Sequence, residues 1–330
     1  MRYMMRYLIL LFCFIFSLSH LAYGSNFSLI SDMGATAQSI ALGNIEGSSR
    51  SADAIFSNPA GLYRVRYYSL SLFQTTVMND INYLNASLCK NTAFGKFGIG
   101  YYLASVNDIP FTAVDTNNDE FIIKEKFSYK NTVAKLAYQK KITRRLHVGL
   151  TYSKYKVSFH EITGNGYGLD FGLLRIFRYF TFSTFIQNLN QGSINYSNAS
   201  DPTYHASEKL PLSVSTSLRY PLFGMIFYPQ IKYYNNNFLP SIGIQYKPIF
   251  MPFLKFNVGY RQLLDYSNQI HSKSSLGFDL KLLTLTFQYA YERSEYILQD
   301  HISYFSLTYN FKINRGVHTG PLPFLLFFAL

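Results

Sequence analysis

Residues 31–43 read Ser31-Asp32-Met33-Gly34-Ala35-Thr36-Ala37-Gln38-Ser39-Ile40-Ala41-Leu42-Gly43, and the small-residue segment that they begin ends with Asn58-Pro59-Ala60-Gly61-Leu62. Asn and Gly tolerate backbone angles that other residues avoid, and Pro fixes its own φ angle. The segment therefore predicts a compact packed piece, and neither a long helix nor a long strand. From about residue 67 to residue 312 the chain changes to short stretches of alternating polar and apolar residues, rich in Tyr, Phe and Thr. This alternation is typical of antiparallel β-strands.

The alternating stretches predict about fourteen strands, bounded by Gly, Asn, Asp, Pro or Lys. In residues 283–293, for example, Leu285 and Phe287 alternate with Thr286 and Gln288. An even number of strands, each about ten residues long, is what a transmembrane β-barrel needs. The expected strands cover residues 67–76, 81–90, 96–106, 127–141, 145–159, 166–177, 179–189, 209–220, 225–234, 239–249, 252–263, 271–282, 283–293 and 301–312.

Composition favours a barrel in a membrane over a water-soluble sheet. Aromatic residues make up 18% of the chain and charged residues 15%, there is no Trp, and the mean hydropathy is +0.01. This average is too polar for helical membrane spans, whereas the charge content is low for a soluble surface. A soluble β-sandwich also alternates, but its exposed face usually carries more charge. We therefore expect an all-β transmembrane barrel.

The N-terminus predicts export. Arg2 and Arg6 precede an apolar run from Leu8 to Leu18, and small residues stand at Ala22 and Gly24. These features are typical of a secretory signal peptide over residues 1–24, cleaved near Gly24, although an uncleaved N-terminal anchor is the alternative. Cleavage leaves Cys89 as the only cysteine, which excludes an intramolecular disulfide. A closed barrel would supply the missing stabilisation, because it leaves no free strand edge.

The net charge indicates a lipid surface more than nucleic acid. The formal charge is +12, and losing Arg2 and Arg6 leaves 28 basic and 18 acidic side chains, or +10. Lys and Arg are dispersed along the chain, so no nucleic-acid stripe is expected. Anionic outer-membrane lipid or lipopolysaccharide is the simpler partner. Aromatic residues near strand ends are the expected interfacial girdles, or else simply good strand formers: Tyr67, Tyr68, Tyr101, Tyr102, Tyr179, Phe180, Tyr233 and Tyr234.

Connections are expected to alternate in length. Short turns are predicted near residues 91–92, 143–144, 177–178 and 248–251, and longer polar links over 107–126, 190–208, 264–270 and 294–300. Barrels of this kind place short turns in the periplasm and long loops outside. The loops with Asp115 to Glu120 and Asn195 to Tyr204 are then exterior contact surfaces, or solvated loops without a partner.

No pattern indicates catalysis, a metal or a cofactor. The seven His residues form no His-x-x-x-His pair, and no Gly-x-Ser-x-Gly elbow is present. Gly164-Asn165-Gly166-Tyr167-Gly168 lacks the following basic helix of a phosphate loop and predicts a turn that opens a strand. We expect a protein that is not an enzyme.

Two blocks in the opening segment resemble a known family. Gly34-Ala35-Thr36-Ala37 with Ala41-Leu42-Gly43, followed by Ala54-Ile55-Phe56-Ser57-Asn58-Pro59-Ala60-Gly61-Leu62, is similar to the N-terminus of PorV/PorQ-family outer-membrane proteins, relatives of FadL-type fatty-acid transporters. Further similarities follow in the family's order: Gly168-Leu169-Asp170-Phe171-Gly172, Gln187-Asn188-Leu189, Leu210-Pro211, Val258-Gly259-Tyr260-Arg261 and His301-Ile302-Ser303. Together they cover most of the mature chain.

The resemblance implies two alternative functions at the outer membrane of a didermic bacterium. Similarity to PorV and PorQ implies a scaffold or component of type IX-like protein secretion, with secretion proteins or cargo as partners. Similarity to FadL implies a channel for hydrophobic small molecules such as long-chain fatty acids, with a hydrophobic ligand in the lumen. Transport predicts an apolar pocket between plug and wall and a lateral gap or kink. The sequence does not choose between them.

Residues 25–66 are the expected plug, because fourteen strands enclose a lumen too wide for wall side chains alone to fill. The resemblance makes Asn58, Pro59, Ala60 and Gly61 the signature of this hatch; a purely structural corner is the alternative. The barrel is expected over residues 67–312, and an apolar tail over 313–330. Arg50 departs from the family, whose members usually carry acidic residues there, and so does the continuation of the chain beyond Phe311.

Overall fold

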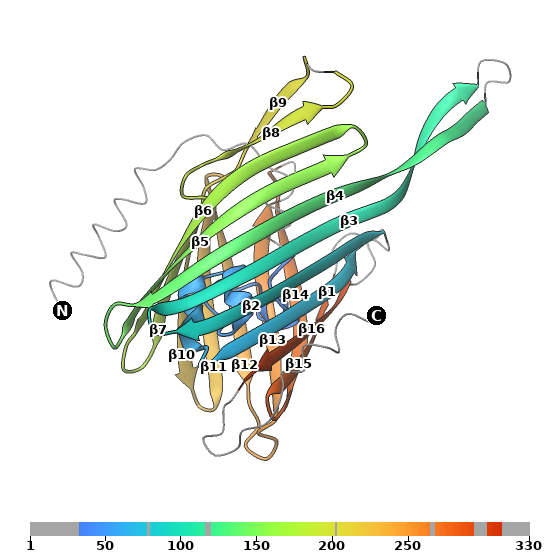
Figure 1. The fold of residues 1–330 in the computed structure, drawn as a ribbon. Coiled ribbons are helices and arrows are strands. Elements are labelled where there is room, and N and C mark those ends of the chain that lie inside the picture. The colour runs from blue at the N-terminus through green and yellow to red at the C-terminus, as the bar shows by residue number, and fades with distance from the viewer. Residues whose placement is uncertain are drawn as a thin grey trace, which may run out of the picture.

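The computed structural model describes residues 33–77, 80–115, 120–201, 203–264, 268–293 and 302–311, and these form a closed antiparallel β-barrel around an internal plug (Figure 1). The expected signal peptide and C-terminal tail lie outside the described residues. Among the described residues, no helix has the length and apolar character needed to cross a membrane.

Sixteen strands share one sheet, and fourteen of them close the barrel. Each strand of the ring pairs with the next along the chain, except that β7 pairs with β10 and β8–β9 lie outside the ring. β1 pairs with β16 to complete the ring. The hairpin β8–β9 is added to the upper part of β6. The strands are β1 (Tyr68–Val77), β2 (Ile81–Thr92), β3 (Gly95–Asp115), β4 (Glu120–Lys141), β5 (Leu146–Phe159), β6 (Ile162–Ile176), β7 (Thr181–Gln187), β8 (Ser193–Asn198), β9 (His205–Lys209), β10 (Ser213–Leu222), β11 (Met225–Tyr234), β12 (Asn237–Tyr246), β13 (Leu254–Leu264), β14 (Ile270–Leu282), β15 (Leu285–Glu292) and β16 (Ile302–Asn310).

The fourteen strands predicted from alternation are the fourteen strands of the ring, so this prediction of the fold class is confirmed. Two predicted links are wrong. The described residues of the link 107–126 are not a loop, because β3 and β4 continue to Asp115 and from Glu120 as a paired ribbon beyond the barrel (Figure 1). Residues 190–208 contain the hairpin β8–β9. Both segments are exposed on most side chains, so they lack the apolar periodicity that reveals a half-buried strand.

The two faces of the wall differ in side-chain size and chemistry. Inward positions of β1 carry Ser69, Ser71 and Phe73, all buried, whereas outward positions elsewhere carry large exposed apolar residues such as Leu276 and Phe305. Such a band of apolar side chains surrounds the barrel on its outside. Aromatic residues of a girdle should face outward. Tyr101 and Tyr179 are exposed, as expected, whereas Tyr102 and Tyr234 are buried inside the barrel, so the prediction is wrong for these two.

The plug consists of three short helices inside the barrel. They are α3 (Ala37–Ala41) and the 3-10 helices η1 (Ala52–Ile55) and η2 (Pro59–Arg64). Thr36 caps α3: its side chain accepts a bond from the Ser39 amide, and the Ser39 hydroxyl accepts one from the Thr36 amide. Small side chains let these helices approach the wall closely, with α3 against β13–β16 and η2 against β4–β6.

Candidate functional site

The motif Asn58-Pro59-Ala60-Gly61 attaches the plug to the wall. The Asn58 side-chain oxygen accepts a bond from the Ala60 amide and so caps η2. Its amide nitrogen donates to the Ser183 hydroxyl at 2.7 Å and to the Thr184 carbonyl at 2.9 Å, both on β7. All four motif residues are buried.

Two wall glycines make room for this contact. A Cβ at Gly172 would lie 2.1 Å from Oδ1 of Asn58, and one at Gly149 would lie 2.5 Å from the carbonyl carbon of Pro59. Real Cβ atoms do not approach other atoms so closely, so only glycine fits at either position. The plug and the wall are therefore matched to each other at β5 and β6.

The opposite side of the plug is held by polar side chains of the wall. Gln38 donates to Oδ2 of Asp279 at 2.6 Å, and the Ser275 hydroxyl donates to the Ile40 carbonyl at 2.7 Å. The Ala37 amide donates to the Ser306 hydroxyl at 3.1 Å. These are individual bonds to side chains, with no strand pairing between plug and wall.

One carboxylate lies inside the plug itself. Asp53 accepts bonds from the hydroxyls of Ser49 and Ser51. Burial raises the pKa of Asp53, and these hydrogen bonds oppose the rise. Arg50 is next to this group in sequence and its pKa is lowered to about 10, chiefly by burial and further by the charges of Arg219 and Arg64.

Above the plug, apolar side chains of plug and wall form one continuous set, which we call the lumen cluster. It includes tightly arranged rings: Phe73 lies 5.5 Å from Tyr83, which lies 5.6 Å from Tyr102, and Tyr102 lies 4.2 Å from Phe56 of the plug, all between ring centroids. Its buried members are Ala35, Ala37, Ile40, Ala41, Phe56, Phe73, Val77, Tyr83, Tyr102, Ala104, Val133, Tyr155, Val157, Ile194, Leu210, Ala290, Ile302 and Tyr304.

One polar side chain stands among these apolar groups without a partner. Asn131 on β4 is 1% exposed, and neither its amide nitrogen nor its amide oxygen makes a hydrogen bond. Its strand neighbours are Ala104 and Val157 of the lumen cluster. A buried amide without a partner costs free energy, so its retention calls for an explanation.

One interruption of the wall lies at residues 167–170 of β6, which we call the branch point. Below it β6 pairs with β7 over Phe171–Ile176, and above it with β8 over Ile162–Gly166. Strand β7 ends at Gln187, and Asn188 turns the chain away with a φ of 54°. Asn tolerates this left-handed conformation better than most residues.

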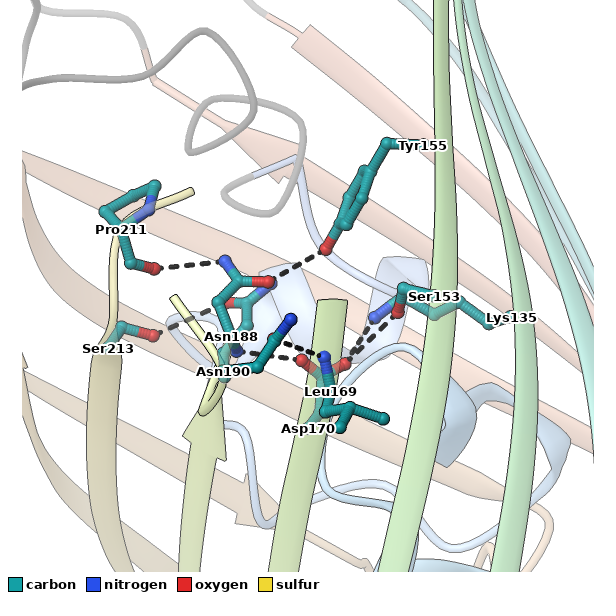
Figure 2. Close-up of polar contacts among 10 residues, drawn as sticks. Lys135, Ser153, Tyr155, Leu169, Asp170, Asn188, Asn190, Pro211 and Ser213 are labelled. Atoms are coloured by element: carbon teal, nitrogen blue, oxygen red, sulfur yellow. Dashed lines mark hydrogen bonds and ion pairs between the residues drawn. The ribbon is translucent and has the colours of Figure 1, made fainter. Parts of the chain in front are cut away.

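Asparagine side chains replace the missing strand pairing at the branch point. Asn190 accepts from the Leu169 amide at 2.8 Å and donates to the Tyr167 carbonyl at 3.3 Å. Asn188 donates to the Pro211 carbonyl and accepts from the Tyr155 hydroxyl, both at 3.0 Å (Figure 2). One backbone bond, from the Leu189 amide to the Leu169 carbonyl at 2.7 Å, joins the same stretch. The closure of the wall at this point thus depends on a few side chains and this single backbone bond.

A buried ion pair supports the same point. Lys135 Nζ lies 2.8 Å from Oδ2 of Asp170, and the two side chains are 3% and 0% exposed. Oδ1 of Asp170 accepts from the Asn188 amide at 3.0 Å, and Ser153 contributes a longer contact to Oδ2 (Figure 2). The network connects β4, β5 and β6 with the end of β7 and the start of β10.

A second ion-pair network lies across the lumen. Arg261 contacts Glu292 through Nε and Nη2, the shortest distance being 2.8 Å, and Lys273 lies 3.3 Å from the same carboxylate. The described residues contain no group of three His, Cys, Asp or Glu side chains arranged to hold a metal ion.

The structure brings together three of the motifs noted in the sequence. Asp170, Asn188 and Pro211 come from separate stretches and meet at the branch point (Figure 2). Sequence reasoning missed Lys135, Ser153 and Tyr155, because only the strand register brings them to the others. It also wrongly made 164–168 a turn, whereas these residues lie within β6, where Gly164 and Gly166 contact the side chains of Tyr196 and Ile194.

Solved structures with a similar fold include hydrocarbon channels. The Pseudomonas putida toluene transporter TodX matches with a TM-score of 0.57 and 14% identity over 89% of this chain and 100% of that one. The monoaromatic hydrocarbon channel CymD gives 0.58 and 12% over 84% and 98%. A Pseudomonas aeruginosa FadL homologue gives 0.57 and 10% over 84% and 98%.

These identities are low, so the likeness establishes the fold. No family model matches the chain. No curated protein matches it by sequence either.

Proposed function

We propose that this protein is an outer-membrane channel for apolar small molecules, which pass between the plug and the barrel wall. The observation that carries the proposal is the lumen cluster, which runs without interruption from Ala37 and Ile40 of the plug to Tyr155, Ile194 and Leu210 beside the branch point. Sites for small apolar ligands are lined mainly by hydrophobic and aromatic side chains with a few polar groups.

The outward apolar band supports the membrane location. Exposed apolar areas of this extent on a soluble monomer would be unstable in water, and a closed barrel is one of the two structures that satisfy the backbone inside lipid. The relatives in fold are transport channels, which is in keeping with a protein that is not an enzyme. The signal peptide remains a prediction from the sequence.

The branch point is the proposed lateral opening through which the path leaves the barrel. Opening it requires breaking the bonds of Asn188 and Asn190 and one backbone bond, from the Leu189 amide to the Leu169 carbonyl at 2.7 Å. The strand pairing of β7 and β8 with β6 stays intact. A molecule in the lumen cluster could then leave or enter through the wall next to Tyr155. We propose this as the lateral gap expected of a transporter.

TodX and CymD are described as channels for toluene and monoaromatic hydrocarbons, which supports a ligand of that apolar kind here. Long-chain fatty acids share the apolar chemistry. The role in type IX-like secretion remains the alternative that the PorV/PorQ resemblance implies, and none of the described contacts favours it.

Uptake by cells tests the proposal. An expressing strain that lacks its own channel should accumulate radiolabelled toluene or oleate faster than the same strain without the protein. The variant Val133→Thr/Val157→Thr makes the lumen cluster more polar at nearly constant volume and should lower uptake. Val258→Thr places the same change on the outer face, where Val258 is 48% exposed, and should have no effect. Equal uptake with and without the protein would contradict the proposal.

A further inference from the structure

Six turns form the end of the barrel opposite the β3–β4 ribbon and the β8–β9 hairpin (Figure 1). They comprise residues 93–94, 142–145, 177–180, 223–224, 247–253 and 283–284, all of which the structure describes. We call this end the turn rim. Its composition differs sharply from the rest of the molecule.

Acidic residues are absent from the six turns of the turn rim. No Asp or Glu lies in one of these turns or within three residues of one. The same stretches contain many cations, namely Lys90, Lys96, Lys140, Lys141, Arg144, Arg145, Arg175, Arg178, Lys247, Lys255 and Lys281. The buried carboxylate of Asp279 lies 3.6 Å from the rim cation Lys255. Exposed acidic residues lie at the other end of the barrel, such as Asp80, Asp108, Glu125, Glu161 and Asp201. The barrel is therefore polarised in charge along its axis.

Each of the six turns of the turn rim also exposes a large apolar side chain. Phe223 and Leu283 are both 89% exposed, and Ile249 is 95% exposed. The set is Phe94, Ile142, Tyr179, Phe223, Ile249, Phe250, Met251, Phe253 and Leu283. Side chains of this size at the tips of turns would be costly in water.

Cations and rings lie next to each other in the rim. The Arg178 guanidinium lies 5.2 Å from the Tyr179 ring centroid, and Arg175 lies 4.9 Å from that of Phe177. A layer that is apolar on one side and anionic on the other matches this arrangement, since aromatic and aliphatic groups enter it while Arg and Lys reach the charged surface.

We propose that the turn rim is a binding surface for anionic phospholipid headgroups, with the turn tips inserted in the headgroup layer. The outward apolar band begins next to the turns, at exposed residues such as Phe97, Tyr246 and Leu282, so the tips lie at its edge. The rim runs around the whole perimeter, which suits a planar lipid layer better than an acidic protein that would contact one side. The inference rests on the membrane location proposed above.

Spin-labelled lipids in vesicles that contain the full-length protein test the inference. Labelled phosphatidylglycerol should associate with the barrel several-fold more strongly than labelled phosphatidylcholine at low salt, and the preference should fall at 0.5 M NaCl. The rim variant Arg144→Gln/Arg145→Gln/Arg175→Gln/Arg178→Gln should lose most of it.

A matched variant removes the same charge from the other end. Lys124→Gln/Lys126→Gln/Lys130→Gln/Lys156→Gln alters exposed residues toward the end opposite the turn rim and should keep the preference. Equal association of the two lipids with the wild-type barrel, or an unchanged preference in the rim variant, would overturn the inference. If soluble polyglutamate binds to the rim while the two lipids associate equally, the inference is overturned and the rim is a surface for an acidic protein.

Insertion is scored separately, by the difference in gel mobility between unheated and boiled samples. A protein that inserts and shows no lipid preference refutes only the turn rim. A protein that does not insert refutes the membrane location as well.

Discussion

Lys135 and Asp170 form a buried ion pair, 2.8 Å between Nζ and Oδ2, at the point where the barrel wall branches. The pair lies on β4 and β6, one strand apart across β5, where Lys135 is in register with Ser153 and Asp170 with Thr151. Oδ1 of the same carboxylate accepts from the Asn188 amide. The ion pair thus fixes the position where β7 leaves the wall.

Asp170→Asn should destabilise the barrel strongly, because it leaves the Lys135 ammonium buried without its counter-charge. Removing one partner of a buried pair costs about 3–5 kcal/mol. Chemical unfolding in detergent would measure the loss. The double variant Asp170→Asn/Lys135→Met should recover part of it, since no unpaired charge remains; a double variant that is as unstable as the single one would contradict this account of the pair.

Asn188→Gly should loosen the branch point while keeping the left-handed backbone, which glycine adopts readily. The substitution removes the side-chain bonds to Tyr155 and Pro211. We expect faster uptake of apolar molecules by expressing cells. The control is Asn236→Gly. Asn236 has a φ of 62° in the turn between β11 and β12, away from the branch point, and the variant should leave uptake unchanged. Slower or equal uptake in Asn188→Gly would argue against an exit at the branch point.

Gly172→Ala should displace the plug, because the new Cβ would meet Oδ1 of Asn58 at 2.1 Å. Ion conductance in planar bilayers should rise as the plug loses its attachment. Gly224→Ala is the comparison: nothing lies within 4 Å of its Cβ position, and its φ of 78° costs only about 1–2 kcal/mol. Conductance that rises equally in both variants would show that general loss of stability, and not plug displacement, is responsible.

Asn131→Leu should stabilise the folded barrel, because it replaces an amide without partners by an apolar group in the lumen cluster. The gain should be about 1–3 kcal/mol, measured by the unfolding transition in detergent. If Asn131 instead contacts a polar group of a ligand, the same variant should bind purely apolar molecules normally and lose affinity for fatty alcohols. A destabilised variant would show that the amide has a structural role.

The raised pKa of Asp53 predicts a specific pH dependence. A carboxyl group whose pKa is higher in the folded than in the unfolded protein stabilises the fold at low pH. This stability should be complete below the unfolded pKa of about 3.9 and should decline as pH rises through the folded pKa of Asp53. The free energy of unfolding of the wild type, relative to that of Asp53→Asn, should therefore be highest at low pH and fall as pH rises. A difference that is constant with pH would mean that burial does not raise this pKa.

The strands could be predicted because a wall with one apolar face and one small or polar face imprints period-two alternation on the sequence. The β8–β9 hairpin could not, since neither of its faces is mostly buried: residues 205–209 are exposed except for a half-buried Glu208. The ion pair could not be predicted either. Lys135 and Asp170 are 35 positions apart, and only the register across β5 brings them together.

The plug motif was recognisable, but its contacts were not. Asn58 in an Asn-Pro turn predicts a corner, which it forms as the cap of η2. That its amide reaches Ser183 on β7 depends on Gly149 and Gly172, and a sequence does not show which glycines admit another segment.

The most direct test of the proposed path is photolabelling of the purified barrel in vesicles with a diazirine derivative of toluene, followed by mapping of the modified peptides. The account predicts labels on lumen residues beside the branch point, at Tyr155, Val157, Ile194 or Leu210, which excess toluene suppresses. Labels confined to outward residues such as Leu276 and Phe305, unchanged by toluene, would contradict a path between plug and wall.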